Sequence, residues 1–265
     1  MFEFEYHRPE SIEAAVKILK DIREGQPLAG GMSLVPTMKL RLSEPRELVD
    51  LNAIADLRGI YREGDNLVIG AMTRHTEVAK SEIVLDAIPA IAQLAGGIGD
   101  PLCRNRGTIG GSVAFNDPVA DYPAGLIGLD AKIHTSERVI AADEFFDELY
   151  ETALVKGELV TKIVFPLPEK AGWAKFSNLA SRYAIVAVMV SISGGIARVA
   201  VTGAKNKVFR VSEMEARLNE SFAADAIKDI KISPDGMNAD IHADAKYRSN
   251  LVNVLAVRAV ESASA

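Results

Sequence analysis

The 265-residue chain has a single cysteine, Cys103, so it cannot form an internal disulfide or hold a cysteine-ligated iron–sulfur cluster by itself. It also lacks a basic excess, since 30 Lys and Arg residues face 36 Asp and Glu residues and the net charge is −6. Binding of a phosphate backbone requires a basic surface. A nucleic-acid partner is therefore not expected.

Long apolar runs are absent as well. The longest one in the C-terminal third spans residues 184–192, far short of the roughly 20 residues that cross a bilayer. Met1 leads into a polar segment and not into a signal peptide. We therefore expect no membrane insertion and a cytoplasmic location.

Residues for metal binding or direct catalysis are also scarce. The 4 histidines lie far apart, and none forms the i,i+4 pair of a helical metal site. We expect no metal site and interpret the histidines as surface or hydrogen-bonded residues. No nucleophile, base and orienting group stand in a recognisable pattern, so we assign no catalytic residue.

The chain contains two glycine-rich segments in place of the usual nucleotide-binding signatures. Neither Gly-x-Gly-x-x-Gly nor Gly-x-x-x-x-Gly-Lys-Ser/Thr occurs. The first glycine segment is residues 29–34, and the second is residues 108–112. Two such loops can present several backbone N–H groups to one anion, of which a diphosphate is the natural example. Each segment taken singly could equally be an ordinary tight turn.

Periodicity predicts an α+β chain in which helices and strands alternate. Ser11 is a candidate N-cap for a first helix, and the second glycine segment is expected as a loop that follows Asp100-Pro101 directly. Pro166, Pro168 and Gly172 mark the expected start of the last domain. Further helices are expected at 34–42, 76–81, one or two within 83–94, 121–129, 143–146, 213–218, 223–230 and 247–261, and strands at 27–29, 48–51, 67–70, 131–135, 158–166, 173–180 and 196–203.

These motifs together resemble the medium subunits of molybdenum hydroxylases, the flavoprotein family of aerobic carbon monoxide dehydrogenase and xanthine dehydrogenase. Ala-Gly-Gly-Met-Ser-Leu at 29–34, and Ile98-Gly99-Asp100-Pro101 leading through the second segment to Asp117-Pro118-Val119-Ala120-Asp121, carry the resemblance. It continues nearly from end to end, through residues 69–75 to Tyr247-Arg248.

The resemblance implies the two-subdomain FAD-binding fold of the vanillyl-alcohol-oxidase/p-cresol-methylhydroxylase type. FAD-binding subdomains would span 1–57 and 58–168, and a C-terminal α+β domain at 169–265 would cover the flavin. In the family both segments contact the diphosphate of FAD. The residues implied here are Ala29, Gly30, Gly31, Met32, Ser33 and Leu34 from the first segment, and Thr108, Ile109, Gly110, Gly111 and Ser112 from the second.

Three further residues match family positions near the cofactor, each with an alternative. Asp121 matches an acidic position beside the ribityl chain and flavin, but it could instead cap the following helix. Ile98 matches an apolar position near the adenine, although such a residue could be plain core. Tyr183 matches a tyrosine that lies over the isoalloxazine ring, or it is simply a tyrosine at a strand end.

Arg104 and Arg106 flank the second segment. They could neutralise diphosphate charge, or they could contact another subunit or cap backbone carbonyl groups.

The function implied by the resemblance is electron transfer. The chain would be the FAD-binding subunit of a molybdopterin-dependent hydroxylase or dehydrogenase, passing electrons from 2Fe-2S clusters of a small partner subunit to an external acceptor. A large partner subunit would hold the molybdopterin, in a heterotrimer or a dimer of heterotrimers. The alternative is a self-sufficient FAD-dependent reductase resembling cell-wall enoyl reductases, which would need NADPH and its own substrate-side acid.

Overall fold

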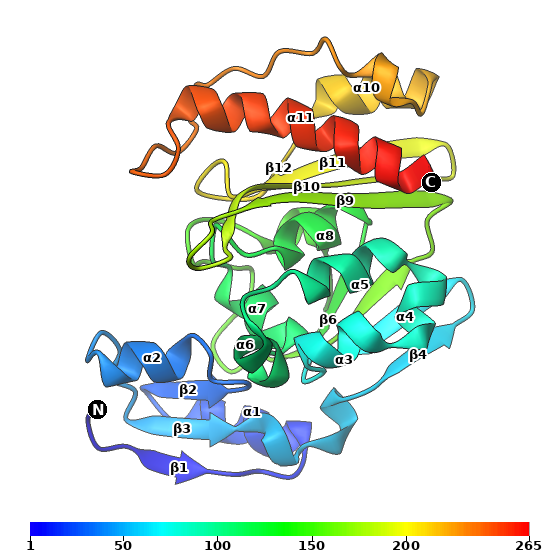
Figure 1. Cartoon of the computed structure of the whole chain (residues 1–265). Helices are drawn as coiled ribbons and strands as arrows, with labels where there is room; N and C mark the ends of the chain where they lie inside the picture. Colours follow the sequence, from blue (N-terminus) through cyan, green and yellow to red (C-terminus); the bar gives the residue numbers. More distant parts are fainter. Residues whose placement is uncertain (265) are drawn as a thin grey trace.

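The computed structural model describes residues 1–264 and arranges them around three β-sheets. Figure 1 shows the sheets one above another, with the N-terminus beside the first sheet and the C-terminus beside the third. Ala265, the last residue of the expected C-terminal domain, lies outside the described residues. The alternation of helices and strands confirms the expected α+β class.

The first sheet is parallel, in the order β1-β3-β2. Its first helix begins where the sequence predicts, because the Ser11 side chain accepts a hydrogen bond from the N–H of Ala14 at 3.2 Å. The elements of this part are β1 (Glu5–His7), α1 (Ile12–Asp21), β2 (Gly25–Leu28), α2 (Leu34–Lys39), β3 (Glu47–Asp50) and the 3₁₀ helices η1 (Leu51–Ala53) and η2 (Ala55–Leu57).

The second sheet is antiparallel and has the order β4-β5-β8-β6-β7. Its strands are β4 (Ile60–Glu63), β5 (Asn66–Gly70), β6 (Lys132–Thr135), β7 (Val139–Ala141) and β8 (Val160–Pro166). Its helices are α3 (His75–Lys80), α4 (Glu82–Ala87), α5 (Pro89–Gly96), α6 (Pro101–Arg106), α7 (Ile109–Phe115), α8 (Tyr122–Gly128) and α9 (Ala142–Phe145).

The third sheet is antiparallel, in the order β12-β11-β10-β9, and is covered on both faces. Helices α5 and α8 of the middle part pack on one side of it, and α10 and α11 lie on the other (Figure 1). The elements are β9 (Lys170–Ser177), β10 (Ala184–Ser193), β11 (Ile196–Thr202), β12 (Phe209–Arg210), α10 (Ser212–Glu220), η3 (Ala224–Ala226) and α11 (Ala245–Ser264). Strand β10 therefore contains the apolar run at 184–192, as a strand buried on both faces does.

One predicted helix is wrong. The segment 223–230 forms only the short η3 turn. The carbonyl groups of Ile227 and Ile230 each accept a hydrogen bond from the side-chain amide of Asn253 in α11, at 2.9 Å. Tertiary contact with α11 thus replaces the helical hydrogen bonds that the apolar spacing suggested.

The strands β1, β4, β7 and β12 were not predicted, because runs of two to four residues carry too little periodicity. Strand β10 was not predicted either, since its sequence is a continuous apolar run without alternation. No helix in the described part of the chain combines the length and the apolar character that a membrane span requires.

Candidate functional site

The first glycine segment connects β2 to α2 and leaves a row of backbone donors free. Gly31 has φ +72°, a left-handed conformation that glycine adopts without steric cost. Among residues 1–264, the N–H groups of residues 30–34 have no hydrogen-bond acceptor. Successive free N–H groups around a left-handed residue form a concave anion-binding nest. The segment is therefore able to bind anionic oxygens.

The second glycine segment is not the loop that we expected. Asp100 caps α6, its carboxylate accepting from the N–H of Cys103 at 2.7 Å, and Thr108 caps α7 directly after α6 ends. The N–H groups of Ile109, Gly110 and Gly111 donate to Thr73 O, Ala71 O and Thr108 Oγ1 at 3.1, 2.8 and 3.2 Å, and that of Ser112 donates to Thr108 O at 3.0 Å. The backbone donors of residues 109–112 are thus satisfied inside the protein. Among the described residues, the N–H of Thr108 has no acceptor, and Gly111 offers its bare Cα and Ser112 its hydroxyl to a ligand.

The first segment packs closely against the second and against the backbone that leads into it. A Cβ added to Gly30 would lie 2.2 Å from the carbonyl oxygen of Arg106, which no real side chain could tolerate. A Cβ on Gly111 would lie 3.4 Å from the Cβ of Ala29. The side-chain amide of Asn52 donates to the carbonyl of Ala29 at 3.0 Å and so fixes the entry to the first segment.

Arg104 binds backbone carbonyl groups. Its guanidinium donates to the carbonyl oxygens of Ile98 and Gly99, both at 2.9 Å. The carbonyl-capping interpretation of Arg104 is thereby confirmed. Ile98 itself is partly buried against the main hydrophobic cluster, and Gly99 adopts φ +50° immediately before α6.

Asp121 does not cap the helix that follows it, so that alternative is wrong. Its side chain, 4% exposed, pairs instead with Lys175 of β9, whose Nζ lies 2.6 Å from Asp121 Oδ2 and also donates to Gly97 O at 3.1 Å. Burial raises the pKa of Asp121 to about 6, while the Lys175 charge opposes the rise. The other carboxylate oxygen, Oδ1, is buried and has no hydrogen-bond partner among residues 1–264. Asp121 can therefore still accept one hydrogen bond.

Lys175 was not selected from the sequence. A lysine between Trp173 and Phe176 in an apolar strand is the signal that could have identified it. Its partner could not be predicted, because 54 residues separate Lys175 from Asp121.

Tyr183 lies directly before β10, after a turn in which Arg182 has φ +61°. Its side chain is 51% exposed. Partial burial and the negative charges of Asp117 and Asp121 raise the pKa of Tyr183. The phenol therefore lies near the chain that follows the second glycine segment.

His75 is buried behind the second segment, contrary to the expectation of a surface or hydrogen-bonded histidine. A Cβ on Gly107 would meet His75 Nε2 at 2.6 Å, and the His75 and Tyr122 ring centroids are 5.4 Å apart. Within the described part of the chain, neither His75 Nδ1 nor the Tyr122 hydroxyl has a hydrogen-bond partner. Burial, with a smaller effect of Arg104, lowers the pKa of His75 to about 4.

Comparison with protein families identifies the chain. Residues 2–168 match the family described as "FAD binding domain in molybdopterin dehydrogenase". This chain belongs to that family. The match covers both glycine segments, Ile98 and Asp121.

Relatives extend the similarity over nearly the whole chain. The carbon monoxide dehydrogenase medium chain of Hydrogenophaga pseudoflava is 36% identical, covering 98% of this chain and 96% of the relative. The nicotine 6-hydroxylase medium subunit of Paenarthrobacter nicotinovorans is 32% identical, over 98% and 97%. In structure, reconstituted CO dehydrogenase from Oligotropha carboxidovorans matches with TM-score 0.88 at 35% identity, covering 99% of each chain.

The chain is thus the FAD-binding electron-transfer subunit of a multi-subunit molybdenum-containing oxidoreductase, as the motifs predicted, and it has the expected FAD-binding fold. The reductase alternative is not favoured. The residues present fit FAD, since the free N–H groups of residues 30–34 suit anionic oxygens and the unpartnered Asp121 Oδ1 suits a hydroxyl donor.

The buried His75 predicts a pH dependence of stability. The folded state holds the imidazole neutral down to about pH 4, whereas unfolded histidine binds a proton near pH 6.5. Stability is therefore lost as pH falls from 6.5 towards 4, by about 3 kcal/mol in total. Urea unfolding followed by Trp173 fluorescence measures the free energy of unfolding. Between pH 6.5 and pH 4, wild type should lose about 3 kcal/mol more of it than His75→Leu does.

Exposed His242→Leu serves as the control, because it removes a surface histidine and leaves the buried His75 in place. Parallel pH curves for wild type and His75→Leu would show that His75 titrates alike in the folded and unfolded chain.

Proposed function

We propose that the first glycine segment and the edge of the second hold the FAD diphosphate between them. The free N–H groups from Gly30 to Leu34 support this role, with the Ser33 and Ser112 hydroxyls as further donors. Thr108, Ile109 and Gly110 contribute by building the helix start that places Gly111 and Ser112 against the first segment. FAD when bound supplies the redox chemistry, and the protein binds it, orients it and excludes water.

Three residues are proposed to contact the rest of the cofactor. Asp121 would accept from a ribityl hydroxyl through Oδ1, while Lys175 holds Oδ2 and fixes the carboxylate. Tyr183 would cover the isoalloxazine ring, which its position near Asp117 and Asp121 supports. Ile98 would pack near the adenine.

The proposed organisation has FAD-binding subdomains at 1–57 and 58–168 and a flavin-covering domain at 169–265. The three sheets support these boundaries, since each proposed domain contains one of them. Met72 and Leu159 nevertheless pack into the hydrophobic cluster of the first part, so the first two subdomains share core.

The proposed assembly joins this subunit to a large molybdopterin subunit and a small subunit with two 2Fe-2S clusters, as a heterotrimer or its dimer. The medium-chain relatives support it, since that term implies larger and smaller partners. Electrons would pass from the clusters to this flavin and on to an external acceptor. A cytoplasmic location belongs to the same proposal.

The contact between the glycine segments can be tested at Gly111. Gly111→Val places a branched side chain between Thr108 and Ala29, where a single Cβ already lies 2.9 Å from Thr108 Oγ1. We expect FAD affinity to fall at least about tenfold, because the close backbone approach is lost. Equilibrium dialysis of folded protein with FAD measures the change.

Gly96→Ala is the matched control, because its added Cβ would meet only the Ala79 Cβ, at 3.8 Å. Unaltered FAD affinity in folded Gly111→Val protein would exclude this segment from the cofactor site.

Replacing Tyr183 should change the fluorescence and reduction potential of the bound flavin more than the amount of FAD that the protein binds. Tyr183→Ala removes the aromatic face, so flavin fluorescence should rise and the reduction potential should shift, while FAD content stays near that of wild type. Tyr183→Phe keeps the ring and should keep the quenching. If emission and potential are the same in wild type and Tyr183→Ala, the ring lies away from the isoalloxazine.

The proposed electron path predicts that reduction of the flavin in this chain depends on the partner subunits. Under anaerobic conditions, chemically reduced small subunit should bleach the flavin of this chain, and NADPH alone should not. Mixed with both partner subunits, the chain should co-elute as a heterotrimer or its dimer. Rapid bleaching by NADPH without partners would contradict the proposal and favour the reductase.

A further inference from the structure

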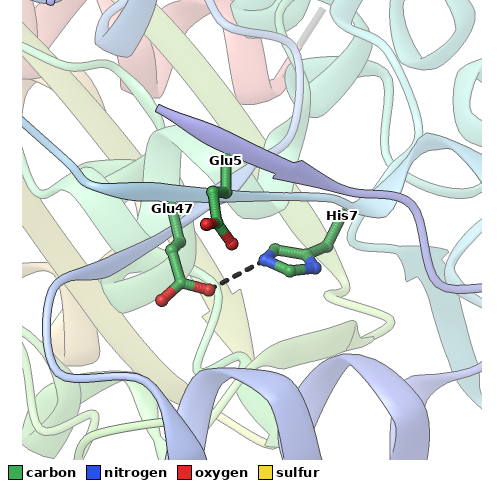
Figure 2. Close-up of side chains that lie close together, drawn as sticks. All are labelled: Glu5, His7 and Glu47. Atoms are coloured by element: carbon green, nitrogen blue, oxygen red, sulfur yellow. Dashed lines mark hydrogen bonds and ion pairs between the residues drawn. The ribbon is translucent and has the colours of Figure 1, made fainter. Parts of the chain in front are cut away.

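Three side chains with metal-binding atoms converge on one face of the first sheet (Figure 2). Glu5 and His7 lie two residues apart on β1 and so point to the same face, and Glu47 of β3 is the register partner of Glu5. By the same alternation this face carries Val49, which packs with Ala15 and Leu19 of α1. The parallel pairing of β1 with β3 therefore creates a cluster that sequence spacing does not reveal.

The cluster has the size of a metal site. One oxygen of each carboxylate and one ring nitrogen all lie within 4.8 Å of one another, and His7 Nε2 lies 2.8 Å from Glu47 Oε2. Bonds from zinc to imidazole nitrogen and carboxylate oxygen are about 2.0–2.2 Å long, so the ligand atoms of one tetrahedral ion stand about 3.4 Å apart. Small side-chain rotations reach that spacing, because Glu5 is exposed and the other two are partly exposed.

The charges around the cluster favour a cation. Among residues 1–264, neither Glu5 nor Glu47 pairs with a lysine or arginine, and the only ion-pair partner of Glu47 is His7. Arg46, next to Glu47 in sequence, pairs with Glu24 instead, with 2.8 Å between Arg46 Nε and Glu24 Oε2. Two neighbouring carboxylates repel each other, and a divalent cation between them would replace that repulsion with attraction.

We propose that Glu5, His7 and Glu47 bind a divalent transition-metal ion of the zinc class, with solvent completing the coordination. The imidazole nitrogen favours such an ion over calcium or magnesium, which prefer all-oxygen sites. The ion would join the edge strand β1 to β3 and so stabilise the sheet. This site is separate from the candidate FAD site.

The test is a metal titration of the tag-free, full-length, FAD-loaded chain after removal of metals with a chelator. Calorimetry with Zn²⁺ should show one saturable site, and Co²⁺ should give the visible absorption of a nitrogen- and oxygen-ligated ion. His7→Ala and Glu47→Gln should each weaken binding about tenfold or more, since even outer-shell changes cost about that much. Exposed His242→Ala is the matched control and should bind like wild type.

The Glu5→Gln variant and the absorption band of bound Co²⁺ provide two further tests of the site. Glu5→Gln alters an exposed side chain, so weaker Zn²⁺ binding in this variant with unchanged FAD content supports the site even where another variant misfolds. No saturable Zn²⁺ binding by wild type, or equal binding by wild type and folded His7→Ala, would overturn the proposal. A thiolate-to-cobalt band would assign the ion to Cys103 and overturn it as well.

Discussion

The backbone contact between Gly30 and the carbonyl of Arg106 is the constraint on which the candidate FAD site depends. It brings the β2–α2 connection against the junction of α6 and α7, and it exists only because Gly30 has no Cβ. Asn52 fixes one side of the contact and His75 fills the space behind the other. The first segment, whose N–H groups are free, thus packs directly against this junction.

Buried polar groups then connect the third sheet to this site. Lys175 crosses from β9 to Asp121, and removing two charges from water costs free energy that only a close, well-oriented pair recovers. Such a pair contributes more to geometry than to net stability. Its role here is to hold one oxygen of Asp121 and leave the other buried and free. The position of Tyr183 relative to Asp121 follows from the same attachment of the sheet.

The errors of the sequence analysis have identifiable causes. Asp100-Pro101 is a helix-start signal, an N-cap followed by proline at the first helical position, yet the glycines beyond it favoured a loop. The helix expected at 223–230 had suitable apolar spacing, but Asn253 of α11 takes its carbonyl groups. The local sequence pattern was sufficient to predict a helix that is capped by its own N-terminal residue, as at Ser11. It was insufficient where a side chain distant in sequence supplies the hydrogen bonds.

The sequence by itself indicated the family and the cofactor through its resemblance to the medium subunits, and it predicted most helices and strands because caps and periodicity are local properties. Only the tertiary structure decided which donors are free: residues 30–34 keep theirs, whereas residues 109–112 donate to neighbouring backbone and to Thr108. It alone also decided that Asp121 meets Lys175 and that His7 meets Glu5 and Glu47. The contacts of Asp121 with Lys175 and of β1 with Glu47 join segments far apart in sequence, and they form only when sheets and helices pack.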